Sequence, residues 1–259
     1  MNPTLRDVAL ALLLECAPDR KAAGALALDL DLPVDSTRVI TEPPGIPGRP
    51  DRPLVVPHAQ IRQRSVRTAE GRAALVHAIA HIELNAIDLA LDAVWRFDGL
   101  PDAFYRDWAG VAREEALHFT LLRDHLHGLG FAYGDFPAHG ALWEMAERTR
   151  GDVLARIALV PRTLEARGLD ASPAVKAKLL GAGDTAGAAI IDRILRDEIV
   201  HVAIGNCWFR WLCDARGLDP VETYAELAAR HAAPRPRGPF NVEARRAAGF
   251  SEAELARLG

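Results

Sequence analysis

One pattern occurs twice in this sequence and limits what the chain can fold into. A glutamate on an apolar helical stretch is followed, 32 or 33 residues later, by a Glu-x-x-His pair on a second apolar stretch. The residues are Glu83, Glu115 and His118 in the first half and Glu165, Glu198 and His201 in the second. An ionised carboxylate on a core-facing stripe is costly unless it is paired or metal-bound. The repeat therefore predicts two similar helix pairs whose polar groups lie together.

These six side chains have the composition of a dinuclear metal site. If the four helices form a bundle, four carboxylates and two imidazoles converge, which is the ligand set of di-iron or di-manganese carboxylate proteins. Four carboxylates balance two divalent ions, and oxygen and imidazole ligands suit iron or manganese. We expect Glu83 and Glu165 as single-carboxylate ligands, Glu115 and Glu198 as bridges, and His118 and His201 as terminal ligands. A buried polar network without metal is the alternative.

Each Glu-x-x-His pair is preceded by another acid, Glu114 in the first half and Asp197 in the second. A ligating histidine usually donates its free ring N–H to an acceptor such as a carboxylate. We therefore predict that Glu114 and Asp197 support the ligands.

His77 and His81 form a competing pair with a spacing that also suits a metal. Both lie more than about 100° round the helix from Glu83, so we expect them at the surface or in a supporting role. Asp88 and Asp92, further along the same stretch, are expected to be solvated or ion-paired.

The remaining pattern predicts an all-α protein. Long helices are expected at 68–97, 101–128 and 184–216, and at 141–168 in two pieces, with a kink at Pro161. Two shorter helices are expected within 3–31, with a break near Pro18. Others are expected at 173–182, at 220–232 and after Ser251, where Glu254 completes a capping box. Six prolines between 40 and 58 predict an extended arm. We expect N-terminal helices and the Pro-rich arm in 1–67, a four-helix bundle in 68–217, and a C-terminal helical extension in 218–259.

The composition limits which classes of partner and which cellular compartment we expect for this chain. The chain has 31 Lys+Arg against 35 Asp+Glu. This lack of overall positive charge does not predict nucleic-acid binding, although a tRNA substrate is kept as an alternative. No uncharged apolar run reaches the ~20 residues of a membrane span. The three cysteines form no C-x-x-C pair and are expected as free thiols, buried or partly buried. With no signal-peptide pattern at the N-terminus, we predict a cytoplasmic protein. Four arginines are expected on a solvated face: Arg235, Arg237, Arg245 and Arg246.

Several segments together resemble the ferritin-like superfamily, and more closely the uncharacterised bacterial family known as domain of unknown function 455. They are His77-Ala-Ile-Ala-His-Ile-Glu83-Leu, Arg113-Glu-Glu-Ala-Leu-His118, Pro161-Arg-Thr-Leu-Glu165-Ala-Arg-Gly-Leu-Asp170, Arg196-Asp-Glu-Ile-Val-His201 and Gly238-Pro-Phe-Asn-Val-Glu-Ala-Arg245. The resemblance covers nearly the whole chain and implies a ferritin-like bundle with a dinuclear metal site. The resemblance does not indicate which reaction the protein catalyses. The bacterial tRNA-modifying hydroxylases are similar at a greater distance and offer the nearest precedent.

Three functions are compatible with these features. The leading hypothesis is a di-iron oxidoreductase that activates O₂ or peroxide and acts on an unknown small-molecule or nucleoside substrate. The second is iron handling, as a ferroxidase or in peroxide detoxification. The third is a non-catalytic binding module, with a structural metal or none. A homodimer is also compatible with the sequence. Separately, the Gly, Pro and aromatic residues of 238–250 suggest that this segment covers one end of the bundle as a lid.

Overall fold

The computed structural model describes residues 3–62 and 64–258, and this part of the chain is all-α, as predicted. Apart from one isolated bridge, no β-structure occurs among these residues. The chain divides into two compact units, Met1–Ala141 (unit 1) and Leu142–Gly259 (unit 2). The division into 1–67, 68–217 and 218–259 stays a prediction.

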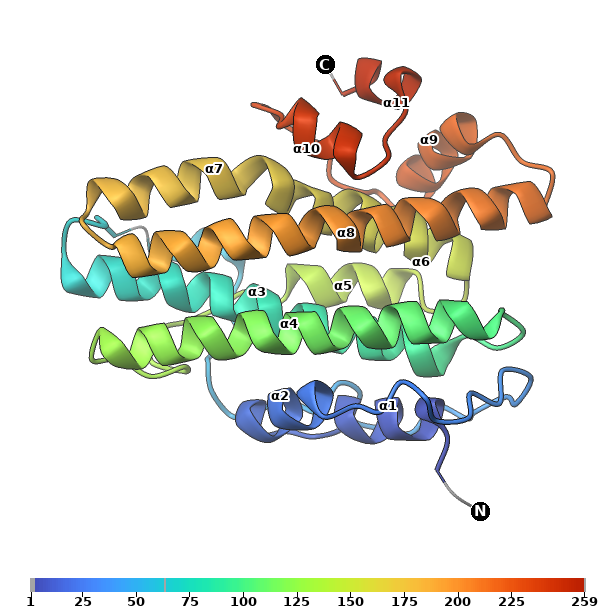
Figure 1. The fold of residues 1–259 in the computed structure, drawn as a ribbon, viewed down its shortest axis with the longest axis horizontal. Coiled ribbons are helices and arrows are strands. Elements are labelled where there is room, and N and C mark those ends of the chain that lie inside the picture. The colour runs from blue at the N-terminus through green and yellow to red at the C-terminus, as the bar shows by residue number, and fades with distance from the viewer. Residues whose placement is uncertain (1–2, 63, 259) are drawn as a thin grey trace. The chain divides into compact units, whose positions relative to one another are not determined.

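The centre of unit 1 is a pair of long helices, α3 (Ala69–Arg96) and α4 (Asp102–Gly128), which lie side by side (Figure 1). Both confirm the long stretches predicted there. Thr68 starts α3 by accepting a hydrogen bond from the Gly71 amide at 3.0 Å. By length and composition α3 could cross a membrane, but most of its apolar window is buried, as in the core helix of a soluble protein.

The two helices predicted near the N-terminus are α1 (Leu5–Leu13), which packs on α3, and α2 (Pro18–Leu26), which packs on α4. Pro18 occupies the first turn of α2, where its missing N–H is tolerated. The buried Arg6 donates hydrogen bonds to the carbonyls of Asp35 at 3.0 Å and Trp95 at 2.8 Å. This side chain therefore fastens the N-terminal segment to the end of α3.

The Pro-rich arm has no regular element over 40–57 and ends in a short turn, η1 (His58–Gln60). Its path is fixed at two places. The Gly48 amide donates to the Leu13 carbonyl at 2.8 Å, and an added Cβ at Gly48 would lie 2.1 Å from the Leu14 oxygen. Further on, the Val56 amide donates to the Ala138 carbonyl at 2.8 Å. The arm is thus extended, as predicted, and packs along unit 1.

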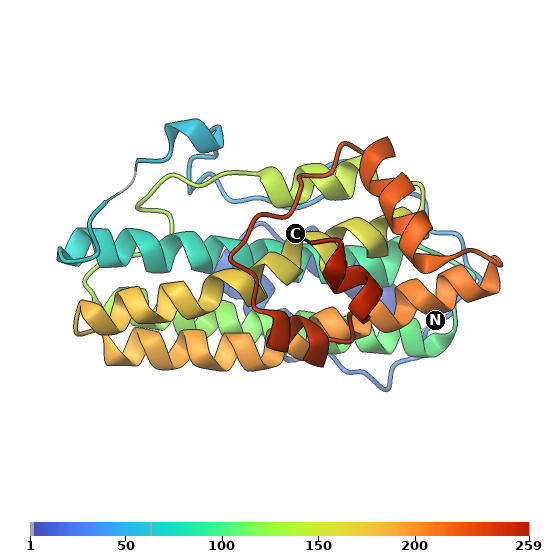
Figure 2. The same cartoon turned by 90° about the horizontal axis from the view of Figure 1, so that it is seen from above.

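Unit 2 is built on α8 (Thr185–Ala215), which packs against α7 (Ala166–Gly181), as Figure 2 shows. The two helical pieces predicted before α7 are α5 (Ala141–Arg148) and α6 (Val153–Leu159). A π-helical turn, η2 (Val160–Glu165), joins α6 to α7 at the position where Pro161 was expected to kink the helix. Gly205 of α8 faces this turn, because a Cβ there would lie 2.8 Å from the Pro161 Cβ.

The separate helix predicted at 173–182 is wrong, because α7 continues through Pro173. A proline inside a helix leaves the carbonyl four residues earlier without its usual donor. Here that carbonyl belongs to Leu169, and it accepts a hydrogen bond from the Asn241 side chain at 3.2 Å. A contact with a distant residue therefore satisfies the group that Pro173 leaves free.

The C-terminal part of unit 2 contains α9 (Pro220–Arg230), α10 (Val242–Ala247) and α11 (Glu252–Ala256). The capping box of Ser251 and Glu254 is confirmed, whereas no helix was predicted where α10 lies. Ala244, Ala248 and Phe250 join a buried apolar cluster with residues of α7 and α8: Ala166, Leu169 and Val202. The segment 238–250 is thus packed into unit 2.

Two surface expectations are wrong. Arg245 is buried rather than solvated, because Asp170 of α7 pairs with its guanidinium at 2.6 Å. The three cysteines are free thiols, as predicted, but Cys16 and Cys207 are exposed and only Cys213 is buried.

Candidate metal centre

Unit 1 brings its three predicted ligands together. Glu83 lies on α3, and Glu115 and His118 lie one turn apart on α4. All three side chains are buried, and one potential ligand atom from each lies within 4.8 Å of the others. His118 Nδ1 is 3.1 Å from Glu83 Oε2 and 3.4 Å from Glu115 Oε2. The helix pair α3–α4 thus holds two carboxylates and one imidazole at one buried point.

The charges of this cluster favour a cation. Burial by itself lowers the pKa of His118, but the hydrogen bonds and charges of Glu115 and Glu83 outweigh it and raise this pKa to about 11. The two carboxylates therefore hold a proton on the imidazole. A divalent metal ion would replace that proton, because a ligating histidine must be neutral. This buried group could hold a metal ion.

Unit 2 carries its three predicted residues on α8 and on the turn η2. Glu198 and His201 are buried one turn apart on α8, with His201 Nδ1 3.7 Å from Glu198 Oε1. Glu165 is half-buried and is the last residue of η2, directly before α7. The donor types repeat those of unit 1, but one carboxylate stands on a π-helical turn instead of an uninterrupted α-helix.

The two acids predicted to support the ligands lie in different environments. Glu114 is exposed on α4, and Asp197 is half-buried on α8, 3.3 Å from the Arg193 Nε. Their supporting role stays a prediction.

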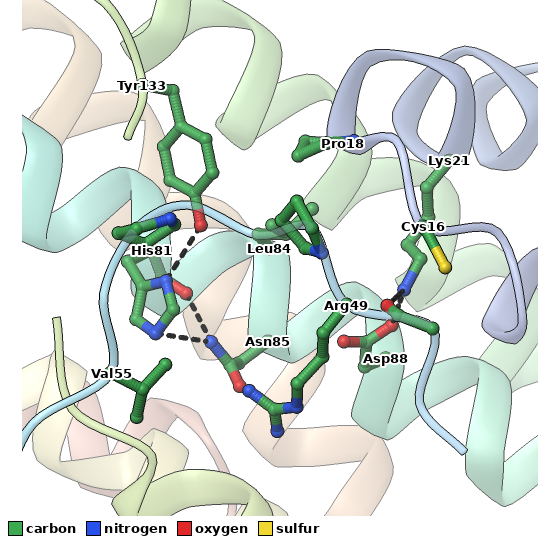
Figure 3. A pocket seen from close by; sticks show the side chains of 13 residues that line it. Cys16, Pro18, Lys21, Arg49, Val55, His81, Leu84, Asn85, Asp88 and Tyr133 are labelled. Carbon is green, nitrogen blue, oxygen red and sulfur yellow. Dashed lines mark hydrogen bonds and ion pairs between the residues drawn. The ribbon is translucent and has the colours of Figure 1, made fainter. Parts of the chain in front are cut away.

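His77 and His81 are buried, so a surface position for them is wrong. The Gly134 amide donates to His77 Nε2 at 2.9 Å, and His81 Nδ1 lies 2.7 Å from the Tyr133 hydroxyl (Figure 3). Asn85 Nδ2 lies 3.1 Å from His81 Nε2. Burial lowers the pKa of each histidine to about 4, so both rings are neutral at pH 7. Both nitrogens of His81 already have hydrogen-bond partners, which argues against metal ligation.

Tyr133 is a partner of these histidines that the sequence did not reveal. Its ring stacks on His77 with 5.1 Å between centroids. Tyr133 comes from the loop after α4, 56 residues after His77, and no local pattern connects the two.

Asp88 and Asp92 are ion-paired, which was one of the two expectations, but both are buried. Asp88 pairs with the buried Lys21 of α2, and Asp92 pairs with Arg96 at 2.8 Å. A cavity of about 30 Å³ lies beside Asp88 and His81 (Figure 3). Since one water needs about 10–15 Å³ on this measure, the cavity suits two or three waters rather than an organic substrate.

The comparisons with known proteins confirm the resemblance to domain of unknown function 455, whereas the ferritin-like superfamily stays a prediction. An uncharacterized protein of Haemophilus influenzae is 50% identical over 215 residues, which are 80% of this chain and 74% of that protein. No solved structure matches the chain. The family model described as "Protein of unknown function (DUF455)" matches residues 15–256, and the chain belongs to this family.

Proposed function

We propose that the protein is a dinuclear carboxylate metalloprotein that binds two iron ions, or manganese in their place, and uses O₂ or peroxide to oxidise an organic substrate. The observation that carries this proposal is the buried group of Glu83, Glu115 and His118 on two uninterrupted helices. Glu165, Glu198 and His201 repeat the same donor order in unit 2. The ferritin-like bundle, in which both helix pairs face one centre, is part of the proposal.

The donor set fits such a centre chemically. Four carboxylates would neutralise two divalent cations, and imidazole and oxygen ligands suit iron and manganese. Iron would supply the electrons that reduce O₂ or peroxide. The chain's part is to hold the ligands in place, to release the proton of His118 when metal binds, and to exclude water around Glu115, which is fully buried.

The substrate under this proposal is a small molecule or a nucleoside. The sequence order of the ligands, shared with tRNA-modifying hydroxylases, supports the nucleoside class, whereas the acidic net charge of −4 favours a small molecule over intact tRNA.

Metal analysis of the chain expressed with iron and manganese both present tests this function. We expect about two metal ions per chain in the wild type. His118→Ala and His201→Ala should each remove tight binding. His127→Ala is the matched control, because His127 lies on the same helix as His118 but is exposed.

Anaerobic reduction followed by O₂ or peroxide in an optical cell tests the reaction. A transient visible band with iron bound supports the oxidoreductase. Two bound metal ions with no optical response would contradict oxygen activation but would still support the metal centre. Wild-type metal content in both ligand variants would overturn the centre itself.

A further inference from the structure

Arg162 of the turn η2 contacts residues that lie far along the chain. It is 3% exposed, and its guanidinium pairs with Glu254 of α11, 92 residues further on. Its Nε donates a hydrogen bond to the Asn206 Oδ1 of α8 at 2.5 Å. The rings of Phe209 and Phe250 lie 4.3 and 5.3 Å from the guanidinium carbon. The side chain is therefore enclosed by α8 and by residues 238–258, which we call the C-terminal segment.

Asn206 connects Arg162 to a second point of the C-terminal segment. Its Nδ2 donates to the carbonyl of Ala248, directly after α10, at 2.7 Å, while its Oδ1 accepts from Arg162. Asn206 is fully buried, and both ends of its amide are hydrogen-bonded, as buried polar groups require. A continuous series of hydrogen bonds thus runs from the end of α10 through α8 to η2.

The contacts of Arg162 hold an uncommon backbone geometry. π-Helical turns are rare and occur mostly as single interruptions of α-helices, frequently at functional sites. Within η2, Pro161 also lacks the N–H that an uninterrupted helix would use. We therefore attribute the geometry of η2 to its contacts with the rest of unit 2 rather than to its own sequence.

Glu165, a predicted metal ligand, depends on this geometry. It is the last residue of η2, three positions after Arg162. A π-helical turn contains more residues than an α-helical turn, so the two geometries would point Glu165 in different directions from α6. Contacts that hold η2 thus also fix where the Glu165 carboxylate lies.

We propose that Arg162 is a positioning residue for the metal centre. By fastening η2 to α8 and to the C-terminal segment, it holds the Glu165 carboxylate where it can bind a metal ion. This inference rests on the proposed function, because Glu165 is one of the proposed ligands. It also gives the C-terminal segment a part in metal binding, although none of the six proposed ligands lies in that segment.

Metal analysis of Arg162→Met in the full chain tests the proposal. Methionine keeps an unbranched apolar side chain but removes the ion pair and the hydrogen bond to Asn206. We expect the metal content to fall from about two ions per chain to about one, because the other proposed ligands stay in place. Arg257→Met is the matched control and should keep about two ions. Arg257 pairs with Glu222 of α9 at 2.7 Å, and this exposed pair does not involve η2.

The visible absorption of the Co²⁺-loaded protein separates positioning from a loss of stability. This absorption depends on the number and geometry of the metal ligands. Under conditions in which urea unfolding shows a folded chain, the spectrum of Arg162→Met should differ from that of the wild type, and that of Arg257→Met should not. A lower urea midpoint with wild-type metal content and spectrum would mean that Arg162 is only structural, and would overturn the proposal.

Glu254→Gln provides a second test if Arg162→Met does not fold. Glutamine keeps a capping-box residue at the start of α11 and removes only the charge that pairs with Arg162. This variant should release one metal ion at a lower chelator concentration than the wild type. Release of both ions at the wild-type concentration would contradict the proposal.

The outcomes distinguish this inference from the proposed function. A wild type that binds two ions, together with Arg162→Met that keeps both with an unchanged Co²⁺ spectrum, would overturn the role of Arg162 alone. A wild type without metal would overturn the proposed function and the role of Arg162 together.

Discussion

The two units carry the same order of acids and histidines but hold them differently. In unit 1, Glu83, Glu115 and His118 stand on unbroken α-helices, and the imidazole lies 3.1 and 3.4 Å from two carboxylates. In unit 2 the distance from His201 Nδ1 to Glu198 Oε1, which corresponds to the 3.4 Å between His118 and Glu115, is 3.7 Å. The remaining acid, Glu165, is half-buried on a π-helical turn. A repeated ligand pattern in sequence therefore does not require a repeated backbone.

The comparison also suggests what each half depends on. Unit 1 fixes α3 through a buried ion pair between Asp88 and Lys21 of α2. Unit 2 fixes η2 through the close approach of Gly205 to Pro161. Substitutions at these places should affect the two halves separately.

The largest effect is expected from Asp88→Ala, which leaves the Lys21 ammonium buried without its partner. Breaking a buried ion pair from one side typically costs about 3–5 kcal/mol of unfolding free energy. Urea unfolding followed by circular dichroism measures the loss. The double variant Lys21→Met with Asp88→Leu removes both charges and should lose much less. A single variant as stable as the wild type would show that unit 1 does not rely on this pair.

A smaller effect, confined to unit 2, is expected from Gly205→Ala. The added methyl would lie 2.8 Å from the Pro161 Cβ, so η2 must shift. Overpacking of this kind costs about 1–3 kcal/mol. We also expect the metal content to fall, because Glu165 moves with the turn. Metal analysis and urea unfolding of the same preparation provide both readouts.

Gly110→Ala is the matched variant in unit 1. Gly110 lies inside α4, and an added Cβ would meet no atom within 4 Å. Alanine favours a helix interior over glycine by about 0.5–1 kcal/mol, so this variant should be slightly more stable, with unchanged metal content. Equal losses of stability and metal in both glycine variants would contradict the distinction between the two halves.

A pH dependence of stability is expected from His77. Its folded-state pKa of about 4 lies below the ordinary value of 6.5, because burial disfavours the charged ring. The unfolded chain therefore binds a proton more readily, and stability is lost as pH falls from about 6.5 to about 4. His77→Gln should lose less stability over this range, as measured by urea midpoints of the chelator-treated protein. The exposed His127→Gln serves as control, and identical pH profiles for all three proteins would contradict this role.

The sequence predicted the helices that carry the site because their apolar periodicity is local and uninterrupted, as around Glu83 and Glu115. It did not predict groups whose partners lie far along the chain. Tyr133 reaches His81 from a loop, Lys21 reaches Asp88 from another helix, and Asn241 satisfies the carbonyl that Pro173 leaves free. Arg162 likewise forms its ion pair with Glu254, which lies 92 residues further along the chain.

The π-helical turn η2 also bears on how relatives of this chain are aligned. Each residue of an α-helix turns the chain by about 100°, and a π-helical turn contains one residue more than an α-helical turn. Val160–Glu165 therefore acts as a one-residue insertion. A relative that lacks this residue would present a neighbour of Glu165 in its place, and a gap of one position in this turn would then mark a chain without the carboxylate.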